Sequence, residues 1–135
     1  MQSLKLTGYR YKYAIVAFGG RPTLWWMHFL KKGFYHCMVA LGDGKEWVIV
    51  DSLLHFTDVI IVKEGDVRLF FKNRGYRIVE IDIAEPKKIQ LRVMPYTCVE
   101  VVKRLIGVEK HGILTPYGLF CYLNEKIGKK SLTIV

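Results

Sequence analysis

Cys98 has the clearest chemical potential of any residue in this chain, because of where it stands in the sequence. It lies in the stretch PYTCVEVVKRLIG, in which Thr97 leads into a helical run that stops at Gly107. The dipole and the backbone N–H groups of a helix's first turn lower the pKa of a thiol and can receive an oxyanion. The sequence therefore predicts that Cys98 is the nucleophile of an acyl-transfer reaction.

A general base and a residue to orient it are predicted in a β-hairpin upstream. The stretch GFYHCMVALGDGKEWVIVDSLL holds two apolar runs separated by Asp43-Gly44, and this dipeptide is typical of a tight two-residue turn. Such a turn places His36 directly opposite Asp51 on one face of the hairpin. A carboxylate there would hold the imidazole in one tautomer and stabilise its protonated form, as in a catalytic triad.

Each of these three residues has a structural alternative. Cys98 could be a small buried core residue, and His36 a core histidine bound to a backbone carbonyl. Asp51 could serve only as a cap for the turn that follows its strand. We prefer the catalytic interpretation because a triad needs all three residue types, and their joint occurrence in a small domain is less probable by chance.

The other two cysteines are predicted to pack in the core. Cys37 alternates onto the opposite strand face from His36, and Cys121 lies in an apolar helical stripe. A zinc site built from His36, Cys37, Cys98 or His111 would lack any recognised ligand spacing. No glycine-rich phosphate loop is present either, so we expect neither a metal nor a cofactor.

The remaining histidines and a tryptophan pair are assigned peripheral roles. His28 and His111 fall in predicted loops and are expected to be exposed bystanders. His55 follows the second hairpin strand and is a candidate residue of the site entrance. Trp25 and Trp26 are expected to pack in the core or in a lid, with a substrate platform as the alternative.

Length and composition favour one domain over residues 1–135. The chain has 135 residues, of which 51% are hydrophobic, but no uninterrupted apolar run approaches the roughly 20 residues of a transmembrane helix. The N-terminus lacks a signal-peptide cleavage pattern. Three cysteines without CxxC spacing indicate free thiols and a reducing compartment. We expect a cytoplasmic protein without a transmembrane span.

The net charge of +9 does not by itself identify a partner. The lysines and arginines are scattered, without the long basic run or the aromatic interleaving of a nucleic-acid groove. We expect a solvated basic surface. Nucleic acid is kept as an alternative partner on the ground of the net charge alone.

The order of the predicted elements indicates an α+β fold with an antiparallel sheet packed against the cysteine-bearing helix. The strands come first along the chain, and most of the helical segments come last. Strands are predicted over 11–18, 34–41, 46–52, 57–62, 76–83 and 88–94, and helices over 66–74, 98–106 and 116–127.

Three segments together resemble a known family. A histidine opening an apolar strand (FYHCMVAL), a polar residue on the next strand (WVIVDSL) and a cysteine starting a helix (PYTCVEVVKRLIG) resemble the circularly permuted NlpC/P60-like branch of the papain-like cysteine hydrolases. In that branch the histidine precedes the cysteine, as here. The segment ILTPYGLFCYL is similar to short phage-encoded members. The resemblance covers about residues 34–123.

The resemblance implies a circularly permuted papain-like fold and a set of catalytic roles. Cys98 would be the nucleophile, His36 the general base and then general acid, and Asp51 the orienting residue. Many relatives have asparagine before the cysteine, whereas this chain has Thr97, so the environment of the oxyanion differs. The residues before Phe34 match no part of the pattern.

Two functions of different classes follow from these observations. The first is a cysteine-dependent hydrolase of amide or acyl bonds that forms an acyl-enzyme at Cys98. The resemblance suggests peptidoglycan stem peptides as its first substrate class, in a phage-type peptidase, and lipid acyl groups as the second. It also implies that the protein is cytoplasmic or virion-associated. The alternative is a non-catalytic basic binding or virion-structural module on the same fold, in which Cys98 is no more reactive than Cys37.

Overall fold

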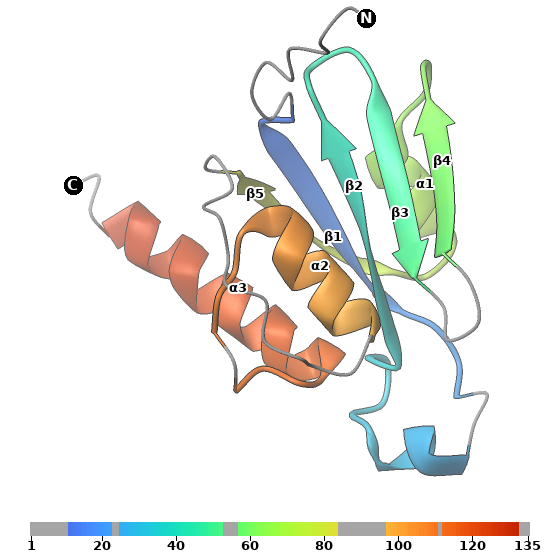
Figure 1. Cartoon of the computed structure of the whole chain (residues 1–135), viewed down its shortest axis with the longest axis vertical. Coiled ribbons are helices and arrows are strands. Elements are labelled where there is room, and N and C mark those ends of the chain that lie inside the picture. The colour runs from blue at the N-terminus through green and yellow to red at the C-terminus, as the bar shows by residue number, and fades with distance from the viewer. Residues whose placement is uncertain (1–10, 23–24, 53–56, 84–96, 111, 133–135) are drawn as a thin grey trace, which may run out of the picture.

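The computed structural model describes residues 11–22, 25–52, 57–83, 97–110 and 112–132, which form a five-stranded antiparallel sheet with helices on both faces (Figure 1). The strand order across the sheet is β4-β3-β2-β1-β5. The strands are β1 (Tyr13–Gly19), β2 (His36–Gly42), β3 (Trp47–Ser52), β4 (Thr57–Val62) and β5 (Arg77–Asp82). The helices are the short 3-10 helix η1 (Trp25–Phe29), α1 (Val67–Asn73), α2 (Cys98–Ile106) and α3 (Pro116–Leu132). The predicted α+β class is confirmed.

The central strands β1 and β2 are buried on both faces of the sheet. Helices α2 and α3 cover one face, and α1 covers the other (Figure 1). Alternate side chains of β1 separate accordingly: Val16 and Phe18 pack in the core beneath α2 and α3, whereas Ile15 and Ala17 pack in the core beneath α1. Strands buried on both faces read as continuous apolar runs, as β1 does. The cysteine-bearing helix therefore packs against the sheet, as predicted.

The described elements lie close to the predicted ranges, with a few differences. The strand predicted over 88–94 falls outside the described residues. The helix predicted over 116–127 continues to Leu132. The connection before β2, for which the sequence predicts no helix, contains η1.

Helix α1 buries a narrower face than its sequence predicts. Asp66 caps the helix by accepting hydrogen bonds from the backbone N–H groups of the first turn. Val67 and Phe71 are buried, as their i, i+4 spacing predicts. Phe70 lies at i+3 from Val67 and would extend this face, but it is exposed, and the guanidinium of Arg74 lies over its ring. A helix of seven residues presents only this one stripe to the sheet.

A buried ion pair ties α2 to the segment that follows it. Lys103 is only 3% exposed, and its Nζ donates to Oε1 of Glu100 at 3.0 Å and to the backbone oxygen of Ile113 at 3.2 Å. The interpretation of Lys103 as part of a solvated basic surface is therefore wrong. The i, i+4 spacing from Val99 places this lysine on the apolar face of α2, where a charge is tolerated only with such partners.

Replacing Lys103 with methionine should destabilise the fold strongly. The Glu100 carboxylate and the Ile113 carbonyl would lose their partner while buried, so we expect the free energy of unfolding to fall by about 3 kcal/mol. Urea denaturation measures the change. Arg104→Met is the matched control, because Arg104 is exposed on the same helix and its loss should cost less than about 0.5 kcal/mol. Equal stabilities of the two variants would contradict the structural role of the buried pair.

Candidate active site

Cys98 is the first residue of α2, as predicted. The side chain of the N-cap residue Thr97 accepts a hydrogen bond from the backbone N–H of Glu100 at 3.3 Å, which fixes where the helix begins. The helix ends at Gly107, whose φ of 80° lies in the left-handed region that glycine adopts most easily. The Cys98 side chain is half-buried, with its Sγ at the positive end of the helix.

The hairpin register differs from the predicted one by two residues. Gly42 pairs with Trp47 and not with Lys45, so residues 43–46 form a four-residue loop. Asp43 causes the longer loop, because its Oδ1 accepts hydrogen bonds from the backbone N–H groups of Lys45 and Glu46, each at 2.9 Å. The Trp47 ring also packs on Gly42, where a Cβ would lie 2.8 Å from the ring. The prediction that His36 lies directly opposite Asp51 is therefore wrong.

His36 and Asp51 nevertheless contact each other. A register shift of two residues keeps each side chain on its face of the sheet, and a shift of one would not. The described pairing ends with Val39 opposite Val50. One residue further, Asp51 lies at the level of Met38 and is therefore diagonal to His36. The Nε2 atom of His36 lies 2.5 Å from Oδ1 of Asp51. With Nε2 committed to the carboxylate, Nδ1 is the ring nitrogen available to a thiol.

The surroundings of Cys98 stabilise its thiolate. The largest influence on the pKa of Cys98 is a hydrogen bond with the Cys37 side chain, which lowers it. Burial raises this pKa, whereas the hydrogen bond and the positive charge of His36 lower it further. The pKa of Cys98 falls from its ordinary value to about 4. Cys98 is therefore an anion at neutral pH.

The same contacts favour the charged form of His36. Burial is the largest single influence and lowers the pKa of the imidazole, but hydrogen bonds to Asp51 and Cys98 and the negative charges of both outweigh it. The pKa of His36 rises to about 9. Between the two pKa values the site holds a thiolate and an imidazolium, with a carboxylate behind the imidazolium.

Cys37 is a residue of this site that the sequence assigns only to the core. It is fully buried, as predicted, and its side chain lies in the core beneath α2. The hydrogen bond with Cys98 raises the pKa of Cys37 well above its ordinary value, so Cys37 stays a neutral donor. In the sequence, only its position next to His36 indicates that Cys37 belongs to the site, because its contact with Cys98 depends on how α2 packs on the sheet.

We expect Cys37 to act as a positioning residue for the Cys98 thiolate. Cys37→Ala removes the donor, so the pKa of Cys98 should rise and its alkylation at about pH 5 should slow by about tenfold. Cys37→Ser keeps an O–H donor and should restore much of the rate. Rates of iodoacetamide modification across pH measure both effects, with Cys121→Ala as the control. Identical pH profiles for wild type and Cys37→Ala would contradict this role.

Several other predicted side chains lie outside this cluster. Trp25 and Trp26 are 77% and 42% exposed, so core packing is wrong for both. His28 is exposed, as predicted. Cys121 was expected in the core but is half-buried, and its hydrogen bond with Tyr117 raises the pKa of that phenol.

No metal-binding cluster of three or more His, Cys, Asp or Glu residues occurs within the described part of the chain. His55 and His111, which the sequence places at the site entrance and in a loop, lie outside the described residues.

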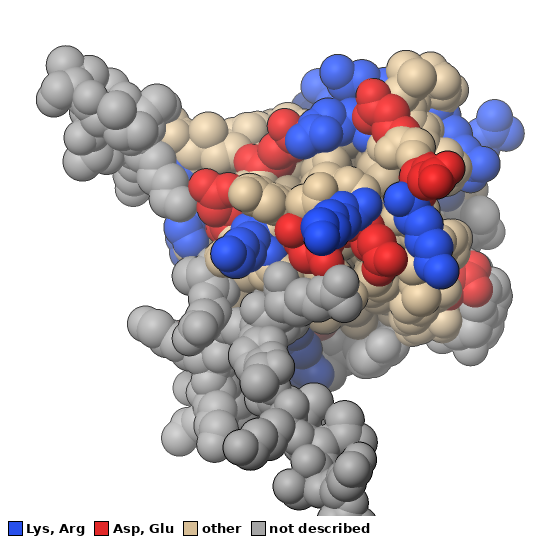
Figure 2. Space-filling model, turned by 90° about the horizontal axis from the view of Figure 1, so that it is seen from above, with Lys and Arg blue, Asp and Glu red and all other residues tan. Residues whose placement is uncertain are grey.

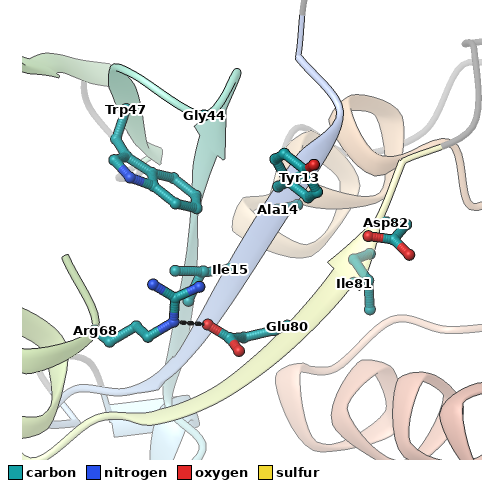
Figure 3. Close-up of a pocket in the computed structure, with 9 residues that line it drawn as sticks. All are labelled: Tyr13, Ala14, Ile15, Gly44, Trp47, Arg68, Glu80, Ile81 and Asp82. Carbon is teal, nitrogen blue, oxygen red and sulfur yellow. Dashed lines mark hydrogen bonds and ion pairs between the residues drawn. The ribbon is translucent and has the colours of Figure 1, made fainter. Parts of the chain in front are cut away.

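A surface pocket of about 450 Å³ lies apart from the thiol (Figure 3). It is formed by β1, β3, β5, the β2–β3 loop and α1, and Cys98, His36 and Asp51 are not among its lining residues. Arg68 and Glu80 form an ion pair across it (Figure 3). Its position separates it from the candidate site.

The site combines the groups that covalent acyl transfer requires. A thiolate is a strong nucleophile, an adjacent imidazolium can protonate a leaving group, and a bound carboxylate keeps that imidazolium oriented. The first turn of α2 adds backbone N–H groups beside the sulfur. No protein-family model, curated protein or solved structure matches this chain.

Proposed function

We propose that this protein is a cysteine-dependent hydrolase of amide or acyl bonds that forms an acyl-enzyme at Cys98. The observation that supports this most strongly is the 2.5 Å contact between the His36 imidazole and the Asp51 carboxylate, together with a half-buried Cys98 at the start of α2 whose pKa the positive charge of His36 lowers. A core cysteine or a core histidine bound to a backbone carbonyl would not need this arrangement.

The proposed reaction begins with the Cys98 thiolate. Sγ attacks the carbonyl carbon of the substrate, and the C=O electrons move onto oxygen, where the N–H groups of the first turn of α2 stabilise the oxyanion. The oxyanion collapses and expels the amine or alcohol, which takes a proton from the His36 imidazolium. This half-reaction leaves a thioester at Cys98 and a neutral imidazole.

Hydrolysis of the thioester restores the starting state. Neutral His36 removes a proton from water as the water oxygen attacks the thioester carbonyl. Collapse of this second tetrahedral intermediate releases the carboxylic acid and returns Cys98 as thiolate, with His36 again protonated. Asp51 holds the ring throughout and stabilises its charged form.

The order of the elements supports a circularly permuted papain-like arrangement. The histidine strand β2 and the aspartate strand β3 precede the cysteine helix α2, which is the order that the sequence resemblance implies. We propose peptidoglycan stem peptides as the first substrate class and lipid acyl groups as the second, with a virion-associated or cytoplasmic site of action. Within the described residues no helix is long and apolar enough to cross a bilayer.

The alternative of a non-catalytic basic module rests on the net charge of +9. Figure 2 looks onto the end of the molecule that carries the β2–β3 loop, and basic and acidic side chains are interspersed there. Mixed charge of this kind does not form a continuous groove for a phosphate backbone on that face.

A substrate panel separates the two functions. Peptidoglycan fragments with intact stem peptides and acyl esters of short and long chain length are incubated with the full chain, and released products are quantified by chromatography. The hydrolase proposal expects multiple turnovers with at least one class. No turnover with any substrate, together with nucleic-acid binding that falls steeply with salt, would favour the binding module.

A further inference from the structure

The short helix η1 exposes a cluster of large aromatic side chains, which we call the η1 aromatic patch and which consists of Trp25, Trp26 and Phe29. The exposed fractions are 77%, 42% and 83%. Trp25 and Phe29 meet edge to face, with ring centroids 6.2 Å apart. Met27, between them, is buried and anchors the helix to the rest of the molecule. Grouped aromatic exposure of this kind marks an interaction surface more often than an ordinary water-facing one.

The charged side chains of the loop that carries the η1 aromatic patch are all basic. Arg21, Lys31 and Lys32 flank it and are exposed. Residues 19–35 contain neither aspartate nor glutamate. The opposite end of the sheet differs, because acidic and basic side chains are interspersed there (Figure 2). The loop that carries the patch therefore joins exposed apolar rings to basic side chains.

The patch lies at the end of the sheet where the candidate active site is. Figure 1 shows η1 beyond the end at which β2 begins. The backbone N–H of Tyr35 donates to the oxygen of Gly19 at 3.1 Å, which closes the loop that carries η1. A Cβ on Gly20 would lie 3.0 Å from the Cβ of His36, so this loop also contacts the catalytic histidine.

We propose that the η1 aromatic patch docks the protein onto an anionic lipid bilayer, with its rings at the boundary between headgroups and acyl chains and Arg21, Lys31 and Lys32 against the anionic headgroups. Tryptophan and phenylalanine beside basic residues are the side chains that favour this boundary. The proposal extends beyond the hydrolase function and does not depend on turnover.

Other partners fit the patch less well. Carbohydrate sites commonly pair an open aromatic face with carboxylate or amide groups, and residues 19–35 have no carboxylate. Grooves for single-stranded nucleic acid stack successive bases on separate rings, whereas Trp25 and Phe29 contact each other edge to face, which covers one of their ring faces. An apolar protein partner would not by itself account for the three exposed basic residues that flank the patch.

Vesicle binding tests the proposal with the full chain. Vesicles of phosphatidylcholine alone are compared with vesicles that contain about one-third phosphatidylglycerol. Binding is measured by co-sedimentation and by the blue shift of tryptophan emission. We expect binding with a blue shift on the anionic vesicles and much weaker binding on the neutral ones. The Cys98→Ala protein should bind equally well, which keeps this result separate from the hydrolase proposal.

Two double variants with matched controls assign the binding to the patch. Trp25→Ala with Phe29→Ala should weaken binding to anionic vesicles by at least about tenfold, whereas Leu69→Ala, which removes an exposed leucine on α1, should change it by less than about twofold. Lys31→Gln with Lys32→Gln should also weaken it by about tenfold. Its control is Lys45→Gln with Lys63→Gln, which removes the same charge from the opposite end of the sheet.

Lys31 also lies over the ring of Tyr117, with its Nζ 5.5 Å from the centroid. Lys32→Gln alone therefore serves as the charge variant if the double variant melts at a lower temperature. Equal binding to both vesicle types, or equal effects of patch and control variants, would overturn the proposal. Loss of affinity for a single-stranded oligonucleotide in the patch variants, with vesicle binding unchanged, would also overturn it.

Discussion

Replacing Cys98 with alanine should abolish product release, lowering the rate by at least about a thousandfold on any substrate that the wild type turns over. Without the sulfur no acyl-enzyme can form, and the remaining His36–Asp51 pair provides no nucleophile. The free energy of unfolding should stay within about 1 kcal/mol of the wild type, because a half-buried side chain contributes little to packing. Product release and urea denaturation of the same preparations measure both quantities.

Two further variants show whether this loss reflects the proposed mechanism. Cys121→Ala is the matched control and should retain activity, because Cys121 lies beside Tyr117 on α3. Asp51→Asn should lower the rate less completely than Cys98→Ala, by about 10- to 1,000-fold, since it disturbs the tautomer and charge of His36 but keeps the thiol. Full activity of Cys98→Ala, or its loss through unfolding alone, would contradict the mechanism.

The second large effect is expected in the pH dependence of Cys98 reactivity. The pKa of Cys98 is lowered to about 4, so its alkylation rate should rise as the pH passes that value and stay nearly constant through neutral pH. Product release also requires protonated His36, whose pKa is raised to about 9, so turnover should fall as the pH rises through that value. A bell-shaped profile with limbs near these two values is expected for the coupled pair.

The His36→Ala variant removes one of the groups that lower the thiol pKa. The acid limb of Cys98 alkylation should then move to higher pH, and the rate at about pH 6 should fall by about tenfold or more. His28→Ala is the control, because that imidazole is exposed. If His36→Ala leaves the alkylation rate and its pH profile untouched, the thiolate–imidazolium pair is wrong.

Local signals in the sequence predict the cysteine helix correctly. The hydroxyl of Thr97 and the backbone freedom of Gly107 mark the two ends of α2, and each acts within a few residues of itself. The faces of the hairpin are also predictable, because alternation along a strand depends only on period two. His36 and Asp51 therefore share a face although the predicted register is wrong.

The register itself depends on side chains whose contacts a sequence does not reveal. Asp-Gly favours a two-residue turn, but Asp43 accepts two backbone hydrogen bonds within a longer loop, and the Trp47 ring packs on Gly42. The contact between Cys37 and Cys98 needs the docking of α2 on the sheet, which joins residues far apart in the chain. Contacts within the folded structure therefore determine both the hairpin register and the proximity of Cys37 to Cys98.

Lys103 differs from these features, because the spacing of its neighbours in the sequence does indicate that it is buried. Val99, Val102 and Ile106 define the apolar face of α2, and the same spacing includes Lys103. Glu100, three residues before it, is the partner that makes its burial tolerable. The charge of Lys103 alone predicts a surface position, whereas the helical periodicity predicts a buried one.

Trapping the acyl-enzyme tests the proposed function most directly. The wild type is mixed with an activated acyl ester, the reaction is stopped with acid, and the adduct is mapped by mass spectrometry of the intact protein and its peptides. The expected result is one acyl group per chain, located on Cys98 and absent from Cys98→Ala. A protein that gains no acyl group, or gains it on Cys37 or Cys121, would contradict the assignment of Cys98 as the nucleophile.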